Sequence, residues 1–272
     1  MTTTSTQPRP SFIALVARNV RAEFTKMRTV RSTMWTLGVM VVLVVGLGAL
    51  ITLAGVSQFD NLSPRAKADF SPVQTALGGL ILAQLAIGVL GALVVTSEYG
   101  TGQIRATLSA TPQRVTMLVA KALTFIAVAF VVGTAACFLA YAVSQPIAAS
   151  KDLAVGLGEP NVLRAIFGAG AYLAGIGAVA LGVGFIVRRT AAAITIVVGI
   201  LLVLPVLAAF IPGTAGATIN KYLPSAVGGA MFTLNERVNT NTLSPGMGFL
   251  IFTLYAVGVL AIGAVILVRR DA

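Results

Sequence analysis

The sequence predicts an all-α, polytopic membrane protein with six transmembrane helices, and three observations support this prediction. Hydrophobic residues make up 57% of the 272 residues and charged residues only 10%, whereas soluble domains carry about 25% charged residues. The mean hydropathy is +0.94. The apolar residues also lie in six uninterrupted runs, each close to the roughly 20 residues that a helix needs to cross a bilayer.

The six runs are the expected membrane spans, and short loops join them into one transmembrane domain over residues 1–272. Gly and Ala are frequent in them, as in helices that pack against one another in lipid. The first run follows a basic stretch without a small-residue cleavage site, so we expect a retained span and not a signal peptide. The runs cover residues 34–56, 73–96, 115–143, 162–187, 191–211 and 247–268.

Two different segments precede the first span. Residues 1–10 are rich in Thr, Pro and Ser and are expected to be a disordered tail. Residues 11–31 predict an amphipathic helix, because apolar residues recur in it at spacings of three and four. These apolar residues are Ile13, Val16, Val20, Phe24 and Met27. The charged residues assigned to the helix are Arg18, Arg21, Glu23, Lys26 and Arg28. A basic amphipathic helix lies in the membrane interface, either as an anchor or as a clamp beside a cytoplasmic partner.

The distribution of basic residues predicts the orientation of the chain. With the N-terminus in the cytoplasm, thirteen of the 19 Lys and Arg residues fall on the inner side. The six outer ones are Arg65, Lys67, Lys151, Arg164, Lys221 and Arg237. This bias is the positive-inside pattern and places both termini in the cytoplasm. Orientation and contact with anionic membrane lipid explain the net charge of +11, so nucleic acid is not an expected partner.

The residue types exclude most enzyme chemistry. The chain has no His and one Cys, Cys137, which removes the commonest catalytic base and any intramolecular disulfide. No Lys follows a Gly, so the chain has no P-loop for ATP, and no GxSxG motif is present. Glu98, Lys121 and Arg164 fall near the span edges and are expected to snorkel. An ion-coupled carrier is therefore poorly supported, and no metal or cofactor site is expected on this chain.

Three further features concern the spans and the longest loop. In the fourth span, two sets of Gly residues repeat every seven positions, which favours close helix packing over a substrate path. Pro205 is expected to kink the fifth span. The loop over 212–245 contains a semi-apolar piece, 222–232, that is too short to span. It is either a re-entrant or interfacial helix beginning at Pro224, or a surface loop with a hydrophobic patch. The first Gly set is Gly168, Gly175 and Gly182, and the second is Gly170, Gly177 and Gly184.

The polar stretch between the second and third spans predicts a short helix at the membrane surface. The second span is expected to end near 96–98, with a sharp turn at Gly100 and Gly102. Thr101 is a candidate N-cap for a helix over about 102–109. Ile104 and Leu108 would face the membrane, leaving Gln103, Arg105 and Thr107 toward the cytoplasm. Thr111 and Pro112 are then expected to restart a helix that carries Arg114 and Lys121 on one face.

The same stretch resembles a known family. The run 98–109, Glu-Tyr-Gly-Thr-Gly-Gln-Ile-Arg-Ala-Thr-Leu-Ser, followed by Pro112, Arg114 and Lys121, is similar to the signature of permease subunits of ABC-2 type transporters. The segment 21–33 is similar to the part of those proteins that precedes the first span. Tyr222-Leu223-Pro224-Ser225 resembles a motif before the last span of actinobacterial members. With six spans in the same order, the resemblance covers nearly the whole chain.

The resemblance implies a function and a set of partners. The chain would be a permease subunit, and not itself an enzyme, that pairs with a second permease subunit in a bacterial plasma membrane. A separate cytoplasmic P-loop ATPase would bind the ATP and Mg²⁺. The segment 97–110 would be the coupling helix that the ATPase pushes, and export is the expected direction. The implied coupling residues are Glu98, Gly100, Thr101, Gly102, Arg105, Arg114 and Lys121. The helix over 11–31 would lie beside the same interface.

Other functions remain open at the level of sequence. A stand-alone secondary transporter or channel would respond to an ion gradient and ignore ATP. A non-transporting scaffold would recruit a partner through the same cytoplasmic helix. A membrane enzyme is the least supported. No span offers a charged or aromatic pocket that names a substrate.

Overall fold

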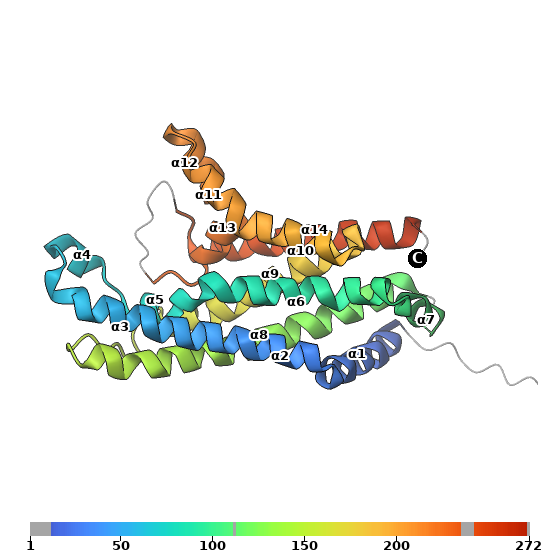
Figure 1. Cartoon of the computed structure of the whole chain (residues 1–272), viewed down its shortest axis with the longest axis horizontal. Coiled ribbons are helices and arrows are strands. Elements are labelled where there is room, and N and C mark those ends of the chain that lie inside the picture. Colours follow the sequence, from blue (N-terminus) through green and yellow to red (C-terminus); the bar gives the residue numbers. More distant parts are fainter. Residues whose placement is uncertain (1–11, 111–112, 235–241, 271–272) are drawn as a thin grey trace, which may run out of the picture.

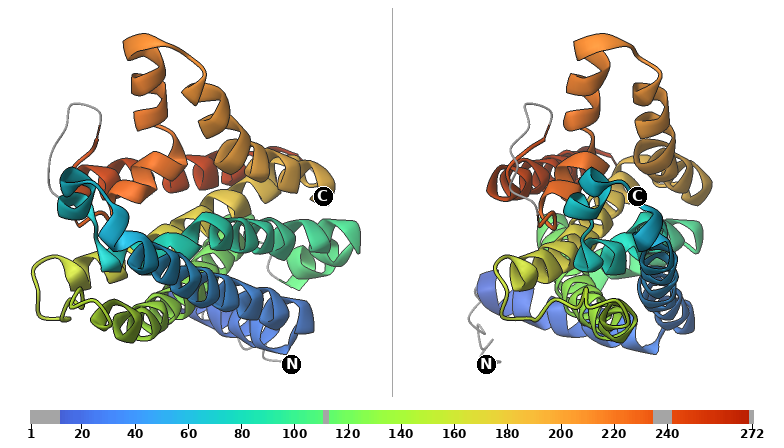
Figure 2. Two further views of the ribbon diagram at one scale, coloured as in Figure 1. Left: turned by 60° about the vertical axis from the view of Figure 1, so that its left-hand side comes forward. Right: turned by 90° about the vertical axis from the view of Figure 1, so that its left-hand side faces the viewer.

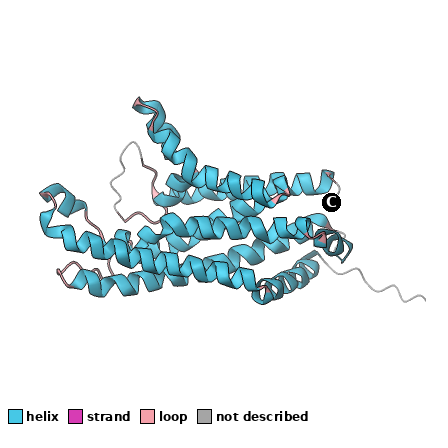
Figure 3. Cartoon of the chain, in the orientation of Figure 1, coloured by secondary structure: helices cyan, strands magenta, loops and turns pink. Residues whose placement is uncertain are grey.

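The chain is a bundle of long helices. The computed structural model describes residues 12–110, 113–234 and 242–270, and no strand is present among them (Figure 3). Within these described ranges, six helical segments are long and apolar enough to cross a membrane, which confirms the predicted helical class and the number of candidate spans. The segments are Arg31–Asn61, Pro72–Gly100, Arg114–Ala149, Val162–Val187, Thr190–Ala209 and Pro245–Arg269. The predicted tail over 1–10 and the predicted cap at 111–112 lie outside the described residues.

The fourth span, α9 (Val162–Val187), forms the centre of the bundle (Figures 1 and 2). It packs against α6 (Leu80–Gly100), α8 (Arg114–Ala149) and α14 (Pro245–Arg269). α8 extends past the predicted end at 143. Its helical backbone continues through the polar residues Ser144 and Gln145 and through Pro146 to Ala149. The apolar run therefore covers only part of α8, and the part that crosses a membrane stays a prediction.

Two further helices lie at one end of the bundle. α1 (Phe12–Thr29) and α7 (Gln103–Ala110) lie there together with the end of α14 (Figure 1). We call this the α7 end. The opposite end carries α4 (Pro64–Asp69) (Figure 1). α5 (Pro72–Ala76) and the short 3-10 turn Leu77–Gly79 lead into α6. The predicted helix near the N-terminus and the predicted short helix after the second span are thus both present.

The first and fifth spans each contain a π-helical segment. In the first span, α2 (Arg31–Val42) and α3 (Gly48–Gln58) flank the π segment Leu43–Leu47. A 3-10 turn, Phe59–Asn61, ends this span. In the fifth span, α10 (Thr190–Val198) passes through the π segment Gly199–Val203 into α11 (Leu204–Ala209). The π segment thus ends two residues before Pro205, and the kink expected at this proline stays a prediction.

The loop after the fifth span is partly helical. α12 (Gly213–Lys221) projects away from the bundle, and α13 (Pro224–Ala230) returns to pack against α14 and α9 (Figures 1 and 2). Val227 of α13 is fully buried. The helix predicted to begin at Pro224 is confirmed, whereas the surface-loop alternative is wrong for this segment. Its depth relative to the membrane stays a prediction.

Glycines allow α9 to approach its neighbours. A Cβ on Gly175 would lie 2.3 Å from the ring of Phe252, and one on Gly182 would lie 2.7 Å from Val259, both on α14. A Cβ on Gly177 would lie 2.3 Å from the ring of Phe125 on α8. These distances are below van der Waals contact, so the two Gly sets give close packing, as predicted.

The single thiol gives a simple test of the packed bundle. Cys137 on α8 is fully buried, so we expect it to stay unmodified by maleimide in mild detergent and to react fully after unfolding in dodecyl sulfate. Mass measurement of the protein before and after unfolding checks this expectation. Rapid modification of the native protein would contradict the packing of α8 against its neighbours.

Candidate functional site

Four charged side chains from three helices meet at the α7 end. Glu23 and Lys26 come from α1, Glu98 from α6 and Lys121 from α8. The Lys121 ammonium lies 2.7 Å from a carboxylate oxygen of Glu23 and 2.7 Å from one of Glu98. Lys26 forms an ion pair with the same oxygen of Glu98. We call these four residues the charge cluster.

The packing of α1 on α8 brings the charge cluster together. Glu23 and Lys26 are three residues apart and so share one face of α1. On that face Met27 is buried, and the Thr124 hydroxyl of α8 donates a 3.4 Å hydrogen bond to the carbonyl of Val20. One face of the amphipathic helix α1 therefore packs against α8 inside the protein. Glu23 is 12% exposed and points into the bundle, and Lys26 is 33% exposed and lies at its edge. Arg18, Arg21 and Arg28 are exposed.

The cluster buries charges that sequence analysis placed at the membrane edge. The side chains of Glu98 and Lys121 are each 1% exposed, so the expected snorkelling of these two residues is wrong. Removing charges from water is costly unless opposite charges compensate. Two ammonium and two carboxylate groups make the cluster neutral. One oxygen of Glu98, Oε2, is buried without a hydrogen-bond partner among the described residues.

α7 is linked to the cluster through the turn that precedes it. Gly102 adopts a φ of 72°, a conformation that non-glycine residues rarely adopt, and this redirects the chain from α6 into α7. Gln103 accepts a 3.5 Å hydrogen bond from Lys26. Ile104 is 3% exposed and belongs to the hydrophobic core. Among the described side chains of α7, Ile104 thus fixes the helix by an apolar contact and Gln103 by a polar contact to the charge cluster.

Several details predicted for this turn are wrong. α6 does not end near 96–98 but continues to Gly100, so of the two glycines in this turn only Gly102 takes a positive φ. Thr101 is not an N-cap, because its hydroxyl donates to the Ser97 carbonyl at 2.9 Å and completes the end of α6. Ile104 packs inside the protein instead of facing the membrane. The side chain of Leu108 lies outside the described residues. Arg105 is exposed, as predicted.

Arg114 lies in a different environment from Lys121, although the two share α8. Its guanidinium donates to the carbonyl of Leu267 at 3.0 Å and to that of Arg270 at 3.3 Å. These contacts hold the start of α8 against the end of α14. The seven implied coupling residues are therefore not one constellation: Glu98 and Lys121 join the charge cluster, and Arg114 holds the C-terminal helix.

Arg188 is a structural residue of the α7 end that sequence analysis did not single out. It joins α9 to α10 with a φ of 60°. Its guanidinium lies 5.1 Å from the centre of the Tyr99 ring and donates to the carbonyl of Ile266 at 3.2 Å. A cation over an aromatic face is attracted by the ring. In the sequence, Arg188 and Arg189 form an isolated basic pair between the fourth and fifth spans. The positive-inside pattern already explained this pair, so it did not indicate a structural role.

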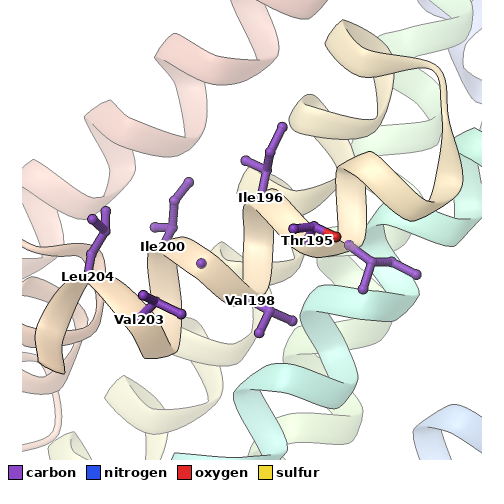
Figure 4. Close-up of a pocket in the computed structure, with 8 residues that line it drawn as sticks. Thr195, Ile196, Val198, Ile200, Val203 and Leu204 are labelled. Carbon is purple, nitrogen blue, oxygen red and sulfur yellow. The ribbon is translucent and has the colours of Figure 1, made fainter. Parts of the chain in front are cut away.

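Two cavities border the charge cluster. One, of about 340 Å³, lies between α1, α7 and α8, and Arg18, Lys26, Gln103 and Thr107 are among its lining residues. The other, of about 230 Å³, lies among α1, α2, α6 and α8. Glu23 and Lys26 line both. A larger hollow of about 520 Å³ lies alongside α10 and the π segment that continues it (Figure 4). Its lining is apolar except for Thr195, whose hydroxyl donates to the Ala191 carbonyl, so we assign no binding chemistry to it.

Comparisons with known proteins do not assign the chain to a family. No protein-family model matches the chain, and a search of curated proteins finds no match either. Among the described residues, no three His, Cys, Asp or Glu side chains are grouped so that they could hold a metal ion. Function is therefore inferred from the residues of the α7 end and from the sequence motifs.

Proposed function

We propose that the chain is the membrane-spanning permease subunit of an ABC transporter of the ABC-2 type. It would pair with a second permease subunit in a bacterial plasma membrane and be driven by a separate cytoplasmic ATPase that carries ATP and Mg²⁺. In this proposal α7 is the coupling helix, the α7 end faces the cytoplasm, and the direction is export. The six spans and the motif around Gly102 support the proposal.

The observation that carries this proposal is the connection of α7 to three helices through the charge cluster. α7 is a short helix set apart from α6 by the turn at Gly102. Gln103 contacts Lys26 of α1, Lys26 pairs with Glu98 of α6, and Glu98 pairs with Lys121 of α8. A displacement of α7 would therefore act on α1, α6 and α8 together. Rigid helices linked by ion pairs are a physical means of coupling distant sites.

The proposal predicts that Arg105→Glu weakens binding of the ATPase without unfolding the permease. Arg105 is exposed on α7, so its replacement changes the docking surface and no core contact. A reversed charge at an interface costs several kcal/mol, and we expect co-purification to fall by about tenfold or more. The measurement is affinity purification in mild detergent, followed by assay of a P-loop ATPase in the eluate. Arg65→Glu, also exposed but at the opposite end, is the matched control and should retain the ATPase.

A second variant tests the turn itself. Gly102→Pro is incompatible with the φ of 72°, because proline fixes φ near −65°. We expect the variant to reach the membrane, with Cys137 still protected, and to lose ATP-dependent transport. Normal co-purification and normal transport by both Arg105→Glu and Gly102→Pro would overturn the proposal.

One observation favours a stand-alone ion-coupled carrier as the second candidate. Glu98 and Lys121 are buried charges on spanning segments, and such residues often mark ion paths in transporters. A carrier would respond to a proton or sodium gradient and be indifferent to ATP. Transport by the purified chain alone in vesicles with an imposed gradient would favour the carrier. A non-transporting scaffold would bind the ATPase but leave its activity unchanged by any substrate.

A further inference from the structure

The 230 Å³ cavity lies where the chain enters its first span. Its walls come from the junction of α1 and α2, from α6 and from α8. Met27, Val30, Leu90, Leu93 and Val94 give it a largely apolar lining. The polar groups are Lys26, Lys121, Glu23 and the hydroxyls of Ser32, Thr33, Thr36 and Ser97. The cavity is smaller than the roughly 300–1,000 Å³ of sites for drug-sized ligands, so it has room for a head group and not for a large solute.

The N-terminus of α2 opens into this cavity without a cap. Val30 is the N-cap residue, and no side chain caps the helix. The backbone N–H groups of Thr33 and Met34 donate hydrogen bonds to the Val30 carbonyl. The N–H groups of Arg31 and Ser32 have no carbonyl partner among the described residues. Unpaired N–H groups and the helix dipole favour an anion at such a position. Val30, Ser32 and Thr33 all line the cavity.

Thr33 is the observation that points independently to a ligand. It is 5% exposed, lines the cavity, and its hydroxyl has no hydrogen-bond partner among the described residues. Other threonines here, such as Thr29 and Thr36, donate to the carbonyl four residues back. Thr33 does not, because the extended backbone of Val30 interrupts the helix between it and Thr29. The Thr33 hydroxyl is therefore open to the cavity and able to donate a hydrogen bond to a group bound there.

The two lysines add unused donors to the same cavity. An ammonium group has three N–H donors. Lys26 uses two, to Glu98 and Gln103, and Lys121 uses two, to Glu23 and Glu98. One donor of each remains without a partner among the described residues. The Glu23 carboxylate also lines the cavity and is paired with Lys121. Because Glu98 pairs with both lysines, the cluster is neutral, and the attraction for an anion comes from the remaining N–H donors and the helix N-terminus.

We propose that this cavity binds the phosphate group of an anionic membrane phospholipid. The phosphate would accept hydrogen bonds from Thr33, Ser32 and Lys26 at the N-terminus of α2. The start of the acyl chains would lie along Leu90, Leu93 and Val94. The apolar lining and the position at the start of a span favour a lipid over free phosphate. The inference does not depend on the proposed transport function.

The test is native mass spectrometry of the full chain in detergent, titrated with three probes. These are dihexanoyl phosphatidylglycerol, dihexanoyl phosphatidylcholine and inorganic phosphate. We expect one saturable adduct with phosphatidylglycerol and much weaker binding of the other two. Thr33→Val removes only the hydroxyl, and loss of a hydrogen bond to a charged group should weaken the phosphatidylglycerol adduct by about tenfold or more. Thr33→Ser keeps a hydroxyl and should retain it.

Two controls separate binding from folding. Thr253→Val makes the same chemical change on the exposed face of α14, and should bind phosphatidylglycerol as the natural chain does. Protection of Cys137 from maleimide reports whether each variant is folded. If Thr33→Val unfolds, Thr33→Ala takes its place, because it also removes the hydroxyl, and it should lose the phosphatidylglycerol adduct to the same extent. Equal adducts in Thr33→Val and Thr253→Val would overturn the proposal. So would equal binding of phosphatidylcholine, or of inorganic phosphate, which would indicate a site for free anions.

Discussion

Replacement of Lys121 by Met is expected to lower the free energy of unfolding by about 3–5 kcal/mol, because it leaves buried carboxylates without their counter-ion. Lys121 is the only member of the charge cluster that contacts both Glu23 and Glu98. Met has a similar length and no charge, so the variant removes the ion pairs with little change in volume. The measurement is thermal or dodecyl sulfate unfolding of the purified protein in mild detergent.

The double variant Lys121→Met, Glu23→Gln separates charge from packing. It leaves the neutral ion pair of Lys26 and Glu98 and should therefore recover most of the lost stability. Lys151→Met is the matched control, because Lys151 pairs with Asp60 in an exposed position and exposed pairs contribute little. If Lys121→Met were as stable as Lys151→Met, Lys121 would not be a buried charge in the folded protein.

Gly91→Ala is expected to be a strongly destabilising change, although it adds only a single methyl group to the bundle. A Cβ at Gly91 on α6 would lie 2.4 Å from the carbonyl oxygen of Gly177 on α9. That oxygen belongs to a backbone and cannot move aside like a flexible side chain, so α6 and α9 must separate. Overpacking of this kind costs about 1–3 kcal/mol and occasionally more. Unfolding in mild detergent measures the loss.

Gly258→Ala is the control for this variant. Gly258 lies within α14, and a Cβ there would meet no atom within 4 Å. Ala favours a helix over Gly by up to about 1 kcal/mol in ordinary helices, and this gain is common to both positions. The difference between the two variants therefore isolates the contact of α6 with α9. Equal stability of the two variants would show that these helices are not in direct contact at Gly91.

The spans were predictable because each satisfies a local requirement. A run of about 20 apolar residues is a property of neighbouring positions in the chain, and so is the short helix after the turn at Gly102. The contacts of the charge cluster are not local. Lys26 and Glu98 are 72 positions apart, and only the docking of α1 on α8 brings them together. Sequence analysis therefore found all four residues and assigned two of them to the membrane edge and two to an interfacial helix.

The errors at the turn have a related cause. Thr is favoured at an N-cap, but the same hydroxyl can bond to a carbonyl four residues back and complete the preceding helix, as Thr101 does. Which bond forms depends on where α6 ends. Arg188 likewise could not be distinguished from an orienting charge until the end of α14 was placed beside it.

The π segment in the first span affects how this sequence should be compared with others. The buried residues of this span are Thr33, Leu37, Met40, Val44, Gly48, Thr52 and Val56. From Met40 onward they recur at every fourth position. In a regular α-helix of 3.6 residues per turn, residues with this spacing would move gradually around the helix and leave the buried face. The wider turn at Leu43–Leu47 offsets part of that drift. A related chain with a regular helix there would match this one beyond Leu47 only after a gap of one position. An ungapped alignment through the span would pair lipid-facing residues of one protein with bundle-facing residues of the other.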